Sequence, residues 1–130
     1  MLNLNYGVIG NNRSAALISN TGSIDWCCLP DFDSPSVFAK ILDKENGGTF
    51  GFEVGEGYSI HQKYLNNTNI LCTTFSSETG SFEVIDFMPR YHISDSDRFL
   101  PAEIYRYIRH LSGQPVFKVN YDPKLNYALD

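Results

Sequence analysis

Two carboxylates lie close together in a short polar stretch of the sequence. Their type and spacing suit acid–base catalysis or cation binding. Asp31 and Asp33 are two positions apart, so both side chains would lie on one face of an extended chain. Two carboxylates at close range can share a proton or bind a cation. The sequence favours the plainer alternative, a solvated loop in which Asp33 helps to cap a following helix.

Two further carboxylates and the single tryptophan occupy apolar segments. Asp25 and Asp86 each lie between apolar residues of an expected strand, where Asp is disfavoured. Such a carboxylate either faces solvent or belongs to a buried hydrogen-bond network, and we expect a structural use for both. Trp26 could offer its indole face to a sugar ring. As the only tryptophan, it is more simply explained as the core anchor of its strand.

Other catalytic and metal-binding patterns are missing from the sequence. His61, His92 and His110 are far apart and match no metal-ligand spacing. No serine stands in a nucleophile-elbow motif, and the glycines form no phosphate-binding loop. The three cysteines, which include the neighbours Cys27 and Cys28, show no zinc spacing and predict free thiols. We therefore expect neither a metal nor a cofactor.

The composition is that of a globular chain of about one domain. The 130 residues are 42% hydrophobic and 19% charged, close to the average for folded proteins. The net charge is −5 with no cluster of Lys and Arg, which argues against nucleic-acid binding. No apolar stretch approaches the ~18 residues of a membrane span, and the N-terminus lacks a secretory pattern. We expect a cytoplasmic protein without nucleic-acid or membrane partners.

Short strands and frequent turns predict an all-β fold. Residues 15–29 should form a hairpin around the turn at 20–23, because Asn and Gly tolerate positive φ. Alternating apolar residues predict a second hairpin over 71–86. Further strands are expected at 6–9, 50–54 and 116–121. Residues 103–111 fit either a helix face or strand alternation, and their aromatic and β-branched content favours a strand. This pattern predicts an antiparallel β-sandwich or barrel.

One segment departs from the two-residue period of strands. Ser34 and Pro35 are typical of a helix N-cap and the first helical position. The apolar residues at 37, 38, 41 and 42 then follow at helical spacing. This segment predicts a short helix over residues 35–42.

The first forty residues carry a far more specific pattern. The segments concerned are Tyr6–Gly10, Arg13–Ile18, Thr21–Trp26 and Leu29–Ala39, which read YGVIG, RSAALI, TGSIDW and LPDFDSPSVFA. They resemble the opening of the N-terminal domain of glycoside hydrolase family 15 proteins of the bacterial and archaeal type, which are glucoamylase-like or trehalase-like. Later segments around Gly47–Gly48, Tyr64–Phe75, Val84–Pro89 and 105–113 are similar to that domain as well.

The resemblance implies a β-sandwich of the super-sandwich type, whole or in part, that packs on a separate (α/α)6 barrel. In that family the barrel carries two Glu residues, which hydrolyse an α-glucosidic bond with inversion as general acid and general base. No glutamate of this chain matches a catalytic motif, so the resemblance implies no catalytic residue here. The implied substrates of the whole enzyme are trehalose or an α-glucan.

If the chain is such an N-terminal domain, the loop of residues 26–36 is the best candidate for contact with a substrate. It joins a strand to the expected helix and concentrates Asp, Pro and an aromatic residue. The candidate residues are Trp26, Asp31 and Asp33, to which we add Arg13. Two other functions stay open: a free-standing carbohydrate-binding module, suggested by the 14% aromatic content, and a module that forms homo-oligomers through an open sheet edge.

Overall fold

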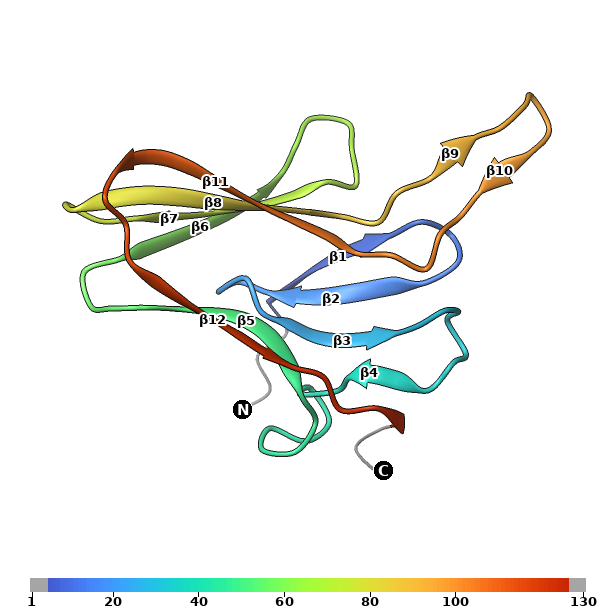
Figure 1. The fold of residues 1–130 in the computed structure, drawn as a ribbon, viewed down its shortest axis with the longest axis horizontal. Coiled ribbons are helices and arrows are strands. Elements are labelled where there is room, and N and C mark those ends of the chain that lie inside the picture. Colours follow the sequence, from blue (N-terminus) through green and yellow to red (C-terminus); the bar gives the residue numbers. More distant parts are fainter. Residues whose placement is uncertain (1–4, 127–130) are drawn as a thin grey trace.

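The computed structural model describes residues 5–126, and they form an antiparallel β-sandwich as predicted (Figure 1). The described strands are β1 (Tyr6–Gly10), β2 (Ala15–Ser19), β3 (Ile24–Cys28), β4 (Ser36–Phe38), β5 (Thr49–Val54), β6 (Ser59–Tyr64), β7 (Leu71–Ser76), β8 (Gly80–Phe87), β9 (Tyr91–His92), β10 (Arg98–Phe99), β11 (Tyr105–Gly113) and β12 (Phe117–Asp122). No described segment forms a helix of the length and apolarity that crossing a bilayer would require.

Two sheets make the layers of the sandwich. One has the order β1-β2-β3-β5-β12, with β4 pairing to β3, and the other has the order β11-β8-β7-β6. The short hairpin β9–β10 projects from one end of the molecule (Figure 1). The consecutive strands β11 and β12 lie at the edges of different sheets, so the chain crosses from one layer to the other between them.

The expected hairpins are confirmed. Strands β2 and β3 pair around a turn in which Gly22 has φ +81°, a conformation that glycine adopts without steric cost. A Cβ on Gly22 would also lie 3.2 Å from the ring of Phe75 in the facing sheet. Strands β7 and β8 form the second hairpin, from Leu71–Asp86 to Ser76–Ser81.

The expected helix over residues 35–42 is wrong. Ser36–Phe38 forms strand β4, which pairs with Cys27 and Cys28 of β3, and a series of turns follows it. A helix of about eight residues is marginal by itself, so strand pairing overrides the helical spacing. The spacing was also misleading about burial, because Phe38 is buried whereas Leu42 is 69% exposed.

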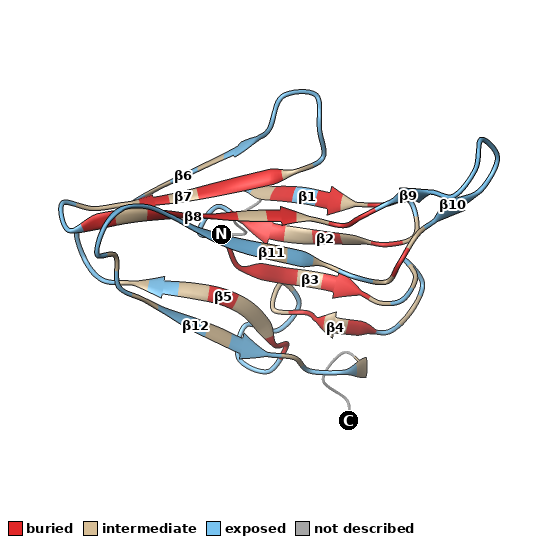
Figure 2. Ribbon diagram, turned by 45° about the horizontal axis from the view of Figure 1, so that its top comes forward, coloured by how far each residue is buried: buried red, intermediate tan, exposed pale blue. Residues whose placement is uncertain are grey.

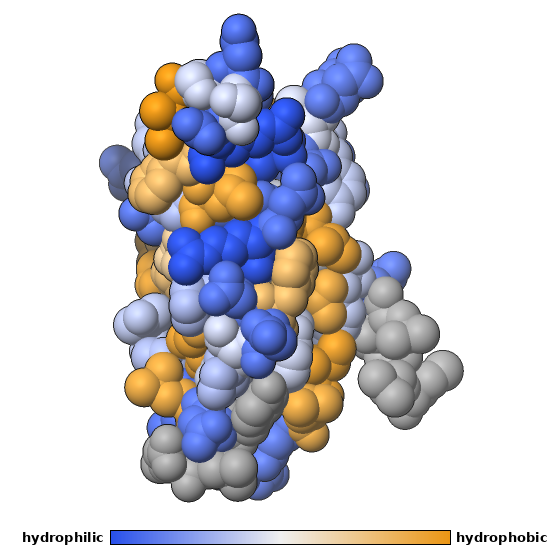
Figure 3. Space-filling model, turned by 90° about the vertical axis from the view of Figure 1, so that its right-hand side faces the viewer, coloured by the Kyte–Doolittle hydropathy of each residue, from blue (hydrophilic) through white to orange (hydrophobic). Residues whose placement is uncertain are grey.

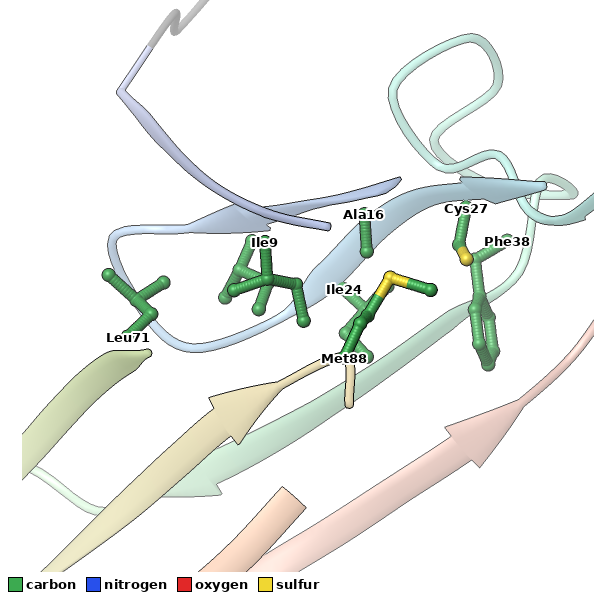
Figure 4. Close-up of a cluster of buried hydrophobic side chains, with 8 residues drawn as sticks. Ile9, Ala16, Ile24, Cys27, Phe38, Leu71 and Met88 are labelled. Atoms are coloured by element: carbon green, nitrogen blue, oxygen red, sulfur yellow. The ribbon is translucent and has the colours of Figure 1, made fainter. Parts of the chain in front are cut away.

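Apolar side chains from both sheets meet between the layers. Figure 2 shows the buried residues concentrated on the central strands. The cluster drawn in Figure 4 consists of Ile9, Ala16, Ile18, Ile24, Cys27, Phe38, Leu71 and Met88. A second cluster contains Phe75 and Phe82, whose rings stack with centroids 4.6 Å apart. The three cysteines are buried free thiols, and burial raises the pKa of Cys27 to about 12.

A buried ion pair joins the two layers. Arg106 of β11 donates from Nε and Nη2 to the carboxylate of Asp86 on β8, at 2.7 and 3.0 Å. The same guanidinium donates to the carbonyl oxygen of Phe50 on β5, at 2.6 Å, and to that of Gly22 in the β2–β3 turn, so it reaches the other sheet. It also lies 4.8 Å from the centroid of the Phe50 ring. Asp86 therefore has the structural use that we expected.

The edge strands on the two sides of the sandwich differ in how far they are covered and in how apolar their exposed residues are. On one side, the Tyr64 hydroxyl of β6 accepts the N–H of Val8 at 2.7 Å and donates to its carbonyl at 3.0 Å. This side chain covers part of the free edge of β1, and β6 itself is polar. On the other side, β11 and β12 present exposed apolar residues, among them Tyr105, Tyr107, Ile108, Leu111, Val119 and Tyr121. The second side also carries a β-bulge in β11 between His110 and Ser112 and an exposed Lys118 on β12, so it is the more apolar of the two sides but not an unprotected one.

Candidate functional site

Three segments converge at the end of the sandwich that carries the candidate residues. They are the β1–β2 turn at 11–14, the loop at 29–34, and the backbone at 100–101. The amide of Asn11, which is buried, donates to the carbonyl oxygens of Pro89 and Pro101, and its Oδ1 accepts the N–H groups of Arg13 and Ser14. In Figure 3, which faces this end, hydrophilic and hydrophobic residues are mixed across the surface.

Arg13 and Asp31, two of the four candidates, lie together at this end. Arg13 donates from Nε to Asp31 Oδ1 at 3.0 Å, and from Nη1 to the Leu100 carbonyl at 2.9 Å. Its own carbonyl accepts the N–H of Phe32, which fixes the loop against the β1–β2 turn. Both side chains remain partly exposed, so the pair is accessible to another molecule.

Asp33 does not join Asp31. Its side chain is exposed, while the loop turns through a hydrogen bond from the Asp31 N–H to Ser34 Oγ. Within residues 5–126, no group of three His, Cys, Asp or Glu side chains is arranged to hold a metal ion. The loop therefore gives no support to the hypothesis of a cation held by Asp31 and Asp33.

Trp26 lies on β3 rather than in the loop. It is half-buried opposite Leu17 of β2, in a strand whose other residues are buried. The neighbouring Asp25 is buried beneath a hydroxyl cluster and accepts hydrogen bonds from Tyr6, Ser23 and Thr49. Burial and the Asp25 hydrogen bond raise the pKa of the Tyr6 hydroxyl. Asp25 thus has the structural use expected from the sequence.

Sequence reasoning missed a groove on the neighbouring side of this end. The groove has a volume of about 860 Å³ and lies between the loop of residues 65–70 and the chain at 87–91. A smaller hollow of about 330 Å³ continues from it past Asn12 and Phe32. The run Asn66-Asn67-Thr68-Asn69 was visible in the sequence, but only the fold places it opposite aromatic residues.

Because the Arg13–Asp31 pair is partly exposed, we expect it to add little to stability. Asp31→Asn should lower the free energy of unfolding by less than about 1 kcal/mol, as for other surface pairs. The difference should shrink further in high salt, which screens exposed charges. Urea denaturation at low and high salt measures both effects. A loss above about 2 kcal/mol would show that the pair acts as a buried one.

Comparison with known proteins identifies relatives along nearly the full length of the chain. A family model described as "Trehalase-like, N-terminal" matches residues 5–129. The chain is 35% identical to a trehalase of Thermoplasma volcanium over 96% of its own length, and 32% identical to a trehalase of Mycolicibacterium smegmatis over 94%. Trehalase 1 of Sulfolobus acidocaldarius is 48% identical over 64% of the chain.

The matched region is a small part of these relatives. The chain spans about one-fifth of the length of the Thermoplasma volcanium and Mycolicibacterium smegmatis trehalases. No solved structure matches the chain significantly. On the evidence of the family model and of relatives aligned along nearly its full length, the chain belongs to the trehalase-like N-terminal family.

Proposed function

We propose that this chain is a non-catalytic part of a trehalase-type glycosidase of glycoside hydrolase family 15. In this proposal, residues 1–130 form the N-terminal β-sandwich or its first part, and the catalytic (α/α)6 barrel is a separate domain. The observation that carries the proposal is the match of the N-terminal family model to almost every residue, in a chain that spans one-fifth of trehalase relatives.

The acidic side chains support a non-catalytic role. Inverting hydrolysis needs two carboxyl groups about 6.5–9.5 Å apart, with room for a water between them. Among residues 5–126, no Asp or Glu lines the groove beside residues 65–70. Asp86 is buried against Arg106, and Asp31 is held by Arg13. The remaining acids of the site, such as Asp33, are exposed on the loop.

In the whole enzyme, the reaction would be hydrolysis of the α-glucosidic bond of trehalose or of an α-glucan. The stretch of residues 26–36, of which 29–35 form the loop between β3 and β4, is our candidate for the part that borders the substrate cleft. Arg13 and Asp31 are the side chains best placed for this, because they are fixed to each other and partly exposed. Trp26 would contribute by shaping β3 behind the loop, since it is half-buried there.

The exposed edges of β11 and β12 are our candidate surface for packing against the barrel. A nine-residue edge strand with exposed Tyr105, Tyr107 and Ile108 is a ready template for pairing unless another element covers it. A second copy of the chain could cover the same edges, which keeps a homo-oligomer as the alternative partner. We further propose a reducing compartment such as the cytoplasm, because the cysteines of the described residues are all free thiols.

An activity assay tests the proposal directly. We expect the purified 130-residue chain to release no glucose from trehalose, maltose or maltotriose. Thermoplasma volcanium trehalase, assayed in parallel, confirms that the conditions detect hydrolysis of trehalose. Turnover that rises in proportion to the amount of the pure chain would refute the non-catalytic assignment.

A further inference from the structure

We propose that the groove between residues 65–70 and 87–91 is a binding site for a neutral saccharide of two or three rings. This inference goes beyond the proposed function, since it concerns a site on the sandwich itself and requires no catalysis. The inference rests on two observations. One wall of the groove carries asparagines and the other carries aromatic residues, and the lining contains a single charged residue and no carboxylate among the described residues. The volume of about 860 Å³ lies within the range of about 300–1,000 Å³ that is typical of small-molecule sites.

One wall of the groove presents side-chain amides. Thr68 holds the loop together, since its Oγ1 donates to the Leu65 carbonyl at 2.8 Å and accepts the Ile70 N–H at 3.2 Å. Asn66, Asn67 and Asn69 line the groove, and none of their side-chain amides has a hydrogen bond within residues 5–126. Each amide offers two donors and an acceptor, which suits the mixed donor and acceptor character of sugar hydroxyls.

The opposite wall presents aromatic rings that are held in place. Phe87 and Tyr91 line the groove. The ring of Phe87 stacks on Tyr105 with centroids 5.3 Å apart, and Tyr91 stacks on Phe99 at 6.2 Å. An aromatic face offers apolar area to the C–H groups of a sugar ring, while a tyrosine hydroxyl can add a hydrogen bond. A ligand between the walls would meet rings on one side and amides on the other.

The lining points to a neutral ligand that is bound rather than cleaved. Arg90 is the one charged side chain among the described lining residues, and no carboxylate is present for acid or base catalysis. The adjoining hollow shares Gly10, Tyr64 and Asn69 with the groove and extends it toward Phe32. This continuity favours an elongated saccharide over a single sugar ring.

NMR titration of the full chain with trehalose and with maltotriose tests the site. We expect saturable shifts, in the millimolar range, at the backbone amides of residues 65–70 and 87–91. Sorbitol, a neutral polyol without a ring, should leave these signals unchanged. Asn67→Gly should weaken binding by about fivefold, the effect of one lost hydrogen bond, and glycine suits the φ of +58° at this position. Asn69→Ala should have a similar effect.

A matched substitution controls for general changes in the chain. Asn46→Ala removes an exposed amide from the turn at 43–46, away from the groove, and should leave the affinity unchanged. The spectra of all variants without sugar show whether the fold is intact. The inference is overturned by a lack of saturable shifts, by shifts that cluster elsewhere, by equal shifts with sorbitol, or by folded Asn67→Gly and Asn69→Ala variants that bind as the original chain does.

Discussion

Arg106→Met should lower the free energy of unfolding by about 3–5 kcal/mol, the usual cost of leaving a buried charge without its partner. Asp86 is fully buried, and the Arg106 side chain is 4% exposed, so water cannot replace the lost contacts. The substitution also removes the donors to the carbonyls of Phe50 on β5 and of Gly22 in the β2–β3 turn. Urea denaturation, followed by circular dichroism, measures the loss.

The double variant Arg106→Met with Asp86→Leu is the matched control. Replacing both members of a buried ion pair by apolar residues is often close to neutral. We therefore expect the double variant to recover more than half of the stability lost by the single one. If both variants were equally unstable, the guanidinium would act mainly through the Phe50 and Gly22 carbonyls and not through Asp86.

The pH dependence of the single variant gives a second readout. Burial raises the pKa of Asp86 in the folded protein, and Arg106 counteracts this rise. Without Arg106 the folded-state pKa lies further above the unfolded-state value, so the folded protein binds the proton more tightly. The resulting stabilisation is fully present below the ordinary carboxyl pKa of about 3.9 and is lost as pH rises through the folded-state value. The stability deficit of Arg106→Met should thus be smaller near pH 4 than near pH 7.

Asn11→Asp should also destabilise the chain by about 3–5 kcal/mol at neutral pH, as expected for an unpaired buried charge. The new carboxylate would keep the two acceptor contacts of Asn11 but would direct an oxygen at the Pro89 and Pro101 carbonyls. In acid, the protonated carboxyl could donate to one of these carbonyls, so the loss should shrink. Thermal unfolding near pH 7 and near pH 4 measures the difference.

The neighbouring residue supplies the control for Asn11. Asn12 is exposed with φ +71°, a conformation that Asp also tolerates, so Asn12→Asp should change stability by less than about 0.5 kcal/mol. Hydrogen exchange adds a local measurement, because Asn11 ties the segments on either side of the β9–β10 hairpin to the β1–β2 turn. We expect faster exchange around Pro89 and Pro101 in Asn11→Asp alone. Equal effects of the two substitutions would contradict the prediction.

Local signals predicted most of the strands but could not predict the pairing of short ones. The turn at 20–23 and the apolar alternation over 71–86 marked two hairpins, because turn residues and alternation act over few residues. Strand β4 and the hairpin β9–β10 were missed, since they exist only through partners supplied by the fold. Strand β6 was missed for another reason: its sequence, SIHQKY, is largely polar and shows no apolar alternation.

The candidate site was predictable only in part. The resemblance directed attention to the loop at 26–36 and to Arg13, and the structure brings Arg13 and Asp31 together. Spacing alone could not show that Asp33 is exposed to solvent or that Trp26 belongs to strand β3. The groove depends on chain segments about twenty residues apart that approach each other only in the folded sandwich.

The unequal edges described above bear on how copies of this chain would aggregate. Pairing between molecules would favour the flank formed by β11 and β12, which exposes more apolar side chains than the opposite flank, where Tyr64 covers β1. A contact in which each molecule uses the same flank satisfies both partners at once and leaves nothing for a third. Concentrated samples should therefore form pairs more readily than fibres.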